Sequence, residues 1–208
     1  AIPFYWKMLD KRGNSNTQER IELMNDILPI LSSSRYSLSG LLADREFIGE
    51  EWMKYLDKQK IPFFIRIKKN SKVLDHQGHM VNANELFEGL ESGEARHLKG
   101  QVTLWGVNVY LSGLRLEDGE DLILASSEDT SESINIYGLR WEIETLFGCL
   151  KGRGFRFEST HITKPDRVKR MVAVLSIAFC WAHKTGEWQS KEDGGIKLKK
   201  HGRLAKSL

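Results

Sequence analysis

Hydrophobic and polar positions in the first thirty residues predict a strand followed by a helix. Residues 2–9 are rich in aromatic side chains, which favours a β-strand. Residues 16–31 place apolar side chains at helical spacing. Asn16 and Glu19 stand three positions apart at the start of this segment and can form a capping box. We therefore expect a helix that begins near Asn16 and ends in the serines after residue 31.

The next forty residues predict a strand, a helix and a second strand. Residues 36–43 form a short apolar run that ends abruptly at Asp44, as a buried strand would. Residues 48–56 repeat apolar side chains with a helical period, and residues 61–69 return to alternation. These three pieces predict a βαβ unit.

The remaining pattern predicts a β-rich segment and then two helices. Frequent glycines interrupt residues 71–125, and residues 102–111 have the pattern of a hairpin. Helical spacing returns over residues 131–151. A last helix is expected from a Thr163 cap to about residue 184, with Gly186 as its stop.

This order of elements predicts a mixed α/β fold, an α+β arrangement with a mixed sheet. We expect residues 1–70 and 126–190 to form one core, with residues 71–125 as a mainly β insertion. Residues 191–208 are expected to be a flexible basic tail. The abrupt first and last residues suggest a piece of a longer protein.

Composition adds a charge asymmetry. Residues 151–208 hold 14 basic and 5 acidic side chains, a balance of +9, whereas the whole chain has a net charge of +3. A polyanion is the partner that this distribution favours, although a solvated basic face is the alternative. The longest apolar run has 11 residues, against roughly 20 for a membrane-spanning helix, so no membrane contact is expected. Two cysteines make no disulfide framework, which favours the cytoplasm.

A stripe of polar side chains marks the predicted helix over residues 131–151. At 100° per residue, one face of a continuous helix would carry Tyr137, Arg140, Glu144 and Lys151. A separate apolar face would seat the helix on a core and consists of Leu139, Ile143, Leu146, Phe147 and Leu150. The polar stripe has two interpretations. It is either a solvated Arg–Glu pair worth about 0.2–0.5 kcal/mol, or an acid for a metal ion beside donors for phosphates.

Asp44 is the natural second acid for such a site. It follows a predicted buried strand, and α/β proteins place reactive groups at strand ends. The alternative is that Asp44 caps a helix that starts near Phe47.

These residues resemble a known family. The spacing Tyr137-x2-Arg140-x3-Glu144-x6-Lys151 resembles the YREK signature of bacterial insertion-sequence transposases of the DDE superfamily. Residues 42–49, LADREFIG, resemble the segment around the second catalytic aspartate of that family. Residues 3–9 with 13–15, and residues 164–171, resemble the flanking segments.

The resemblance implies an RNase H-like core with a β-rich insertion between the second and third acids. It implies that Asp44 and Glu144 are those acids and bind two Mg²⁺ or Mn²⁺ ions for cleavage and strand transfer of DNA phosphodiesters. Tyr137, Arg140 and Lys151 would contact phosphates of double-stranded DNA near a transposon end. A homodimer in a synaptic complex, on the nucleoid, is the expected assembly.

The chain departs from the family pattern at the first aspartate. That residue lies on a strand upstream of the one expected here, and Asp10 stands at a turn in the wrong motif. We therefore expect the architecture of the catalytic core without competent catalysis. The alternatives are a non-catalytic DNA-binding or interaction fragment of a decayed transposase, and an unrelated hydrolase that uses two carboxylates without metal.

Other candidates have weaker support. Trp105 could hold a flipped base or could be a packed hairpin aromatic. Arg66, Lys68 and Lys69, at the end of a strand, could follow a DNA backbone or be solvated. His76 and His79 lack cysteine partners and are expected to be loop residues rather than zinc ligands.

Overall fold

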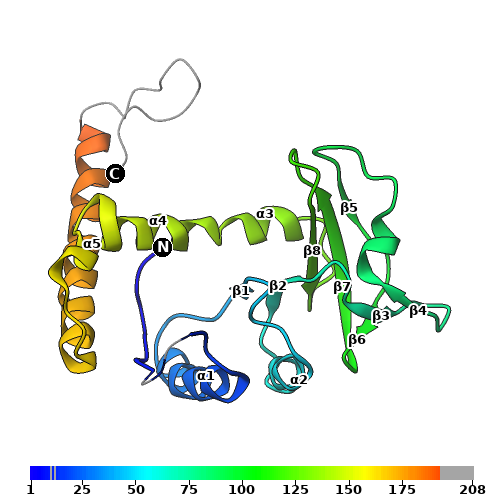
Figure 1. Ribbon diagram of the computed structural model, residues 1–208, viewed down its shortest axis with the longest axis horizontal. Coiled ribbons are helices and arrows are strands. Elements are labelled where there is room, and N and C mark those ends of the chain that lie inside the picture. The colour runs from blue at the N-terminus through cyan, green and yellow to red at the C-terminus, as the bar shows by residue number, and fades with distance from the viewer. Residues whose placement is uncertain (10, 12, 193–208) are drawn as a thin grey trace. The chain divides into compact units, whose positions relative to one another are not determined.

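The computed structural model describes residues 1–9, 11 and 13–192. The chain divides by its contacts into two compact units, a larger one of residues 12–141 and a smaller one of residues 1–11 with 142–208. Figure 1 shows the elements of both. This division differs from the predicted boundary between a core and an insertion, which stays a prediction.

The larger unit is built on an eight-stranded mixed sheet with the order β1-β2-β8-β7-β6-β3-β4, and β5 pairs with β7. Only β1 and β2 are parallel among the described strand pairs, and the others are antiparallel. The strands are β1 Leu41–Ala43, β2 Phe63–Ile67, β3 Lys72–Leu74, β4 Met80–Asn82, β5 Ala95–His97, β6 Val102–Leu104, β7 Val107–Arg115 and β8 Asp121–Ser126. A mostly antiparallel mixed sheet with several helices confirms the expected mixed α/β class and is consistent with an RNase H-like α+β core.

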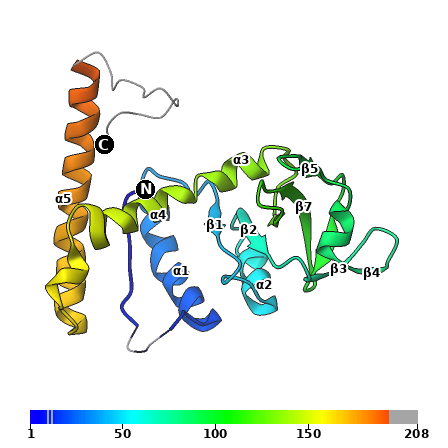
Figure 2. The same ribbon diagram turned by 45° about the horizontal axis from the view of Figure 1, so that its top comes forward.

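Helices cover both faces of this sheet. α1 (Thr17–Ser32) and α2 (Glu50–Lys58) lie on one side, and α3 (Ser133–Gly138) lies on the other (Figure 1, Figure 2). The main core forms on the α2 side, where Trp52 and Leu56 pack with the alternate residues of β2, among them Ile65. Arg66 therefore belongs to the opposite, α3-facing surface, because successive side chains of a strand point to opposite faces.

Two local predictions are confirmed in this unit. The Asn16 side chain accepts a hydrogen bond from the Glu19 N–H at 2.9 Å, and the Glu19 carboxylate accepts one from the Asn16 N–H at 2.7 Å. This is the capping box at the start of α1. The segment β1-α2-β2 is the predicted βαβ unit, although its first strand is only three residues long and Tyr36 is exposed.

The predicted β-rich segment is also confirmed. β6 and β7 form the expected hairpin, and Trp105 and Gly106 between them both have positive φ, 50° and 78°. Two such residues in a two-residue turn match the twist of the strands they join. The 3₁₀ helix η1 (Ala83–Phe87) adds buried side chains beside these strands. Since β8 pairs with β2, the segment continues the same sheet.

The smaller unit contains α4 (Trp141–Gly148), which starts at the unit boundary, the π-helix η2 (Cys149–Arg153), the 3₁₀ helix η3 (Phe157–Thr160) and α5 (Pro165–Glu192). α5 does not stop at Gly186 as expected. A glycine costs a helix interior only about 1 kcal/mol, and the residues after it favour helix. Among the described residues, no helix combines the length and apolar character needed to cross a membrane. The predicted tail lies, from residue 193 onward, outside the described residues.

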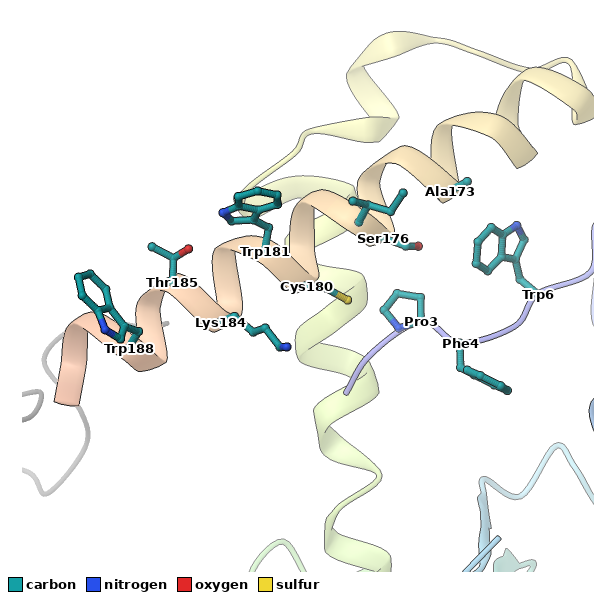
Figure 3. Close-up of a pocket in the computed structure, with 11 residues that line it drawn as sticks. Pro3, Phe4, Trp6, Ala173, Ser176, Cys180, Trp181, Lys184, Thr185 and Trp188 are labelled. Atoms are coloured by element: carbon teal, nitrogen blue, oxygen red, sulfur yellow. The ribbon is translucent and has the colours of Figure 1, made fainter. Parts of the chain in front are cut away.

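Residues 2–9 do not form the predicted strand. The described remainder of their unit is helical and offers no strand edge to pair with. Pro3, Phe4 and Trp6 instead line an apolar groove of about 720 Å³ together with Trp181 and Trp188 of α5 (Figure 3).

The predicted continuous helix over residues 131–151 is interrupted. Leu139 and Arg140 form a turn between α3 and α4, directly after Gly138, a poor helix former. The chain then widens into the π-helix η2, so the 100° spacing of the predicted stripe does not hold across the segment. The predicted apolar face is buried only at Leu146 and Leu150, and its exposed members are Leu139, Ile143 and Phe147.

Candidate functional site

Asp44 lies at the carboxyl end of β1, beside the carboxyl end of the parallel strand β2. The side chain is half-buried, and its Oδ1 accepts the N–H of Arg45 at 2.7 Å. α2 starts only at Glu50, and Gly49 occupies its N-cap position. Asp44 therefore does not cap this helix. It stands where α/β folds place their reactive groups.

Sheet register explains why Arg66 shares a face with residues from distant segments. Arg66 pairs with Leu124, Leu124 with Ser112, and Ser112 with His97. Cross-strand partners lie on the same face, so this row faces α3. Ala43 pairs with Ile65, so the next residues, Asp44 and Arg66, come at the same level of the two strands. Because side chains alternate along a strand, those of Asp44 and Arg66 belong to the same face.

Tyr137 brings these charges together. It lies on α3, is 3% exposed, and is surrounded by the α3-facing surface of the sheet. Burial is the largest cause that raises the pKa of Tyr137, and the Asp44 carboxylate raises it further. The positive charges of Arg140 and Arg66 act in the opposite direction and lower this pKa. The phenol is therefore within electrostatic reach of Asp44, Arg66 and Arg140, all in the larger unit.

Arg140 is placed by aromatic rings. Its guanidinium carbon lies 5.4 Å from the ring centre of Tyr137 and 5.5 Å from that of Trp141. Cation–π contacts of this kind restrict the positions that a long side chain can take. The turn after α3 thus holds a half-buried cation close to the buried phenol.

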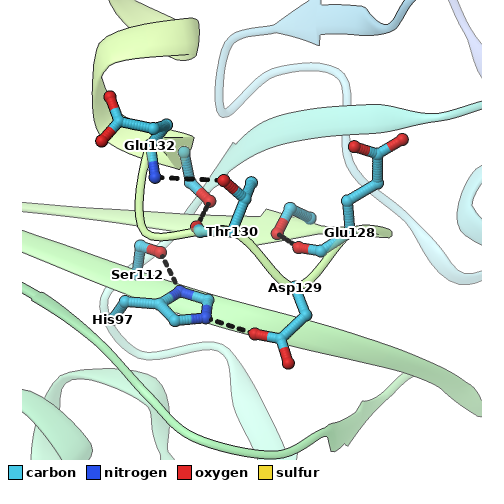
Figure 4. A network of polar contacts seen from close by, with 8 residues as sticks. His97, Ser112, Glu128, Asp129, Thr130 and Glu132 are labelled. Carbon is cyan, nitrogen blue, oxygen red and sulfur yellow. Dashed lines mark hydrogen bonds and ion pairs between the residues drawn. The ribbon is translucent and has the colours of Figure 1, made fainter.

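A polar network fixes the loop that leads into α3 (Figure 4). His97 bridges Ser112 Oγ at 2.9 Å and Asp129 Oδ1 at 2.7 Å through its two ring nitrogens. Farther along, the Ser133 hydroxyl donates to the Thr130 carbonyl at 2.6 Å. These bonds tie the start of α3 to β5 and β7, which sets the position of Tyr137 on the sheet.

The same network resembles a serine–histidine–aspartate array but does not present a nucleophile. Ser112 is 1% exposed, whereas the side chain of Asp129 is 60% exposed. A nucleophilic serine needs the opposite arrangement, with the hydroxyl open to substrate and the acid buried. We therefore assign His97 a structural role.

Glu144 and Lys151 belong to the smaller unit. Glu144 is exposed on α4, and Lys151 lies on η2 with its Nζ 5.9 Å from the Phe147 ring centre and 4.0 Å from Glu158 Oε1. Asp44 lies in the larger unit. The convergence of the two acids stays a prediction.

Lys68 and Trp105 complete the predicted residues. Lys68 is exposed directly after β2. Trp105 is partly buried and packs against the core of the larger unit from its place in the β6–β7 turn. Its contact with a flipped base stays a prediction.

Within the part of the chain that the structure describes, no group of three or more His, Cys, Asp and Glu side chains is arranged to hold a metal ion. Asp44 alone offers one carboxylate, with two arginines nearby. Mg²⁺ requires an octahedral set of oxygen ligands, so these residues do not by themselves complete a metal site.

Comparison with known proteins decides the family. Residues 4–181 match the family described as the transposase DDE domain. The chain belongs to this family. No curated protein matches it. Transposases of this family act on DNA, belong to the nuclease and transferase enzymes and use divalent metal ions. The match covers the site described above and leaves the YREK branch a prediction.

Sequence reasoning missed the residues that register alone brings to the site. Arg115 and Glu120 lie near Arg66 because the β7–β8 hairpin pairs with β2, and Arg45 lies there because β1 also pairs with β2. The DREF segment was a signal for Arg45. Glu120 gave no signal in the sequence, because its position depends on which strand β8 joins.

Proposed function

We propose that the chain is the catalytic core of a DNA transposase of the YREK branch, which in complete form cleaves and joins DNA phosphodiesters at transposon ends. The observation that supports this most is the cluster of Asp44, Arg66, Tyr137 and Arg140 at the carboxyl ends of β1 and β2. An acid beside several cations at a strand end suits a phosphate-containing substrate.

The proposed roles follow from chemistry. Arg66, Arg140 and Lys151 donate hydrogen bonds to phosphates, and Tyr137 orients Arg140 through its ring. Lys68 follows the DNA backbone, and Trp105 is the candidate for base stacking. Asp44 and Glu144 are the proposed ligands of Mg²⁺ or Mn²⁺. The proposed assembly is a homodimer on double-stranded DNA, in the cytoplasm.

Metal binding tests the pair of acids. The 208-residue chain is titrated with Mn²⁺ in a calorimeter, together with Asp44→Asn and Glu144→Gln. We expect each change to remove the binding heat. Glu142→Gln removes the same charge from the same helix and should leave it unchanged. Equal heats for Glu144→Gln and Glu142→Gln, or no Mn²⁺ binding by the unchanged chain, would contradict the assignment.

Activity of the 208-residue chain tests the missing acid. We expect this polypeptide not to cut or join transposon-end DNA in the presence of Mg²⁺, because it supplies two of the three acids. Cleavage products on a denaturing gel that disappear with Asp44→Asn would show that another residue replaces the first aspartate.

A non-catalytic DNA-binding fragment is the second candidate, favoured by the cations around Tyr137. In that case DNA binding should survive Asp44→Asn and Glu144→Gln, and metal binding should be absent. Neutralising Arg140 and Lys151 should weaken DNA binding in both cases. A hydrolase that uses two carboxylates without metal would bind neither Mn²⁺ nor DNA.

A further inference from the structure

A cleft beyond the carboxyl end of β2 is lined by five basic and three acidic side chains. It has a volume of about 490 Å³ and lies wholly within the larger unit. Its basic lining residues come from three segments: the loop after β1, the end of β2 and the end of β7. They are Arg45, Arg66, Lys68, Lys69 and Arg115. We call these residues, with the turn opposite them, the basic groove.

Three of the five basic side chains are available to a ligand. Arg45, Lys68 and Lys69 are exposed, and within the described residues they form no ion pair. Arg115 differs, because its Nε lies 3.0 Å from Asp121 Oδ1 and its Nη1 donates to the Gly119 carbonyl at 3.1 Å. Arg115 therefore holds the β7–β8 turn in place.

The β7–β8 turn and the start of β8 place three carboxylates in the groove, those of Asp118, Glu120 and Asp121. Glu120 Oε2 lies 3.3 Å from Nη2 of Arg66. The Arg66 side chain is 18% exposed, whereas that of Glu120 is 63% exposed. The Leu116 N–H donates to the Glu120 carbonyl at 2.8 Å, which closes the turn and fixes the origin of the side chain. An ion pair with one exposed partner contributes little free energy and is easily exchanged.

We infer that the basic groove binds the phosphate backbone of double-stranded DNA, and that Glu120 occupies the Arg66 guanidinium until a phosphate displaces it. The inference rests on the proposed function: it extends the contacts proposed for Arg66 and Lys68 to the whole groove and adds a competitor for one of them. A carboxylate and a phosphate oxygen use the same edges of an arginine, so the two exclude each other.

The arrangement fits a polymer better than a single small anion. Lys68 and Lys69 are consecutive and project from an exposed strand end, and Arg45 reaches the groove from a different loop. Cations spread along a groove engage successive phosphates and release counterions from DNA. In a site for one phosphate, the cations would instead surround a single point.

The competitor is tested by neutralising it. Binding of the 208-residue chain to a fluorescent duplex of arbitrary sequence is measured by anisotropy over a range of salt concentrations. We expect Glu120→Gln to tighten binding about two- to fivefold, because Arg66 no longer exchanges a carboxylate for a phosphate. Glu117→Gln removes the same charge from the same turn but does not line the groove, and should tighten binding less. Equal effects of the two changes would overturn the role of Glu120.

The groove itself is tested by its lysines. Replacing both lysines, Lys68→Gln with Lys69→Gln, should weaken DNA binding. The slope of log K against log salt should become shallower by the amount that corresponds to about two phosphate contacts. The matched control is Lys58→Gln with Lys72→Gln, two exposed lysines outside the groove. Control and groove variants with the same salt dependence would overturn the inference.

The outcomes separate the groove from the proposed function. If the Arg140 and Lys151 variants lose DNA affinity while the groove variants match their controls, the groove fails and the function stands. If the unchanged chain binds neither duplex DNA nor Mn²⁺, the proposed function fails as well. Adding inorganic phosphate as a competitor distinguishes the polymer from a small anion. Displacement of the duplex at low phosphate concentration would contradict the assignment to DNA.

Discussion

Gly113 of β7 is a position where a single methyl group matters. A Cβ atom built on it would overlap the ring of Phe87, which is 1% exposed on η1. We expect Gly113→Ala to lower the free energy of unfolding by about 1–3 kcal/mol through overpacking. Urea denaturation measures this. Gly138→Ala is the control, since nothing lies within 4 Å of its Cβ position at the end of α3, and it should cost nothing. Equal stabilities of the two variants would show that Phe87 can move aside.

Asp75 gives the larger unit a pH-dependent contact. Its Oδ1 accepts the N–H of His79 at 2.8 Å and that of Gln77 at 2.9 Å. The His79 N–H is the largest cause that holds the pKa of Asp75 below its ordinary value. A carboxyl with a lowered folded pKa stabilises the fold above its unfolded pKa, and this contribution disappears as pH falls through the folded pKa.

Asp75→Ala should therefore reduce stability at neutral pH, and the difference from the unchanged chain should shrink to nothing in acid. Denaturation at a series of pH values measures the two curves. Asp57→Ala removes an exposed acid of α2 and should give a difference that does not depend on pH in this way. A constant difference for Asp75→Ala would mean that the carboxylate form contributes nothing.

At the scale of elements, α1 depends on its capping box. Asn16→Ala removes the acceptor for the Glu19 N–H and should cost about 0.5–2 kcal/mol. Asn16→Asp keeps an acceptor and should restore most of that free energy. Thermal unfolding followed by circular dichroism measures both changes. Loss of stability in both variants alike would show that the side chain acts through another contact.

Local signals made some elements predictable. The capping box, the βαβ unit and the β6–β7 hairpin are determined by neighbours in sequence, and each formed as expected. The interruption at Leu139 and Arg140 was not predictable, because Gly138 tolerates both helix and turn, and context decides between them. Residues 2–9 have strand propensity, but a strand also requires a partner edge.

The candidate site was also predictable only where local sequence signals place its residues. Asp44 was found from its place at a strand end, and Tyr137 with Arg140 from their spacing. Their approach to Arg66 depends on β2 pairing with both β1 and β8, which is a long-range choice. Glu120 could be found only once that register was known.

At the scale of the whole molecule, charge distribution predicts how the chain binds DNA. Residues 193–208 hold five basic and one acidic side chain. A chain that ends at residue 192 should bind duplex DNA more weakly. The slope of its log K against log salt should become shallower by the amount that corresponds to up to about four phosphate contacts. Anisotropy over a salt series measures this, and the unfolding of the larger unit serves as the control. An unchanged salt dependence would mean that these cations do not reach the DNA.

The outer strands of the sheet have a consequence for how copies of the chain behave together. β1 and β4 end the strand order, β5 pairs on one side only, and each has three residues. In the described part of the chain, these borders offer few unpaired backbone groups to a neighbouring copy. Crowded solutions of the protein are therefore protected against the edge-to-edge growth by which longer exposed strands build fibres.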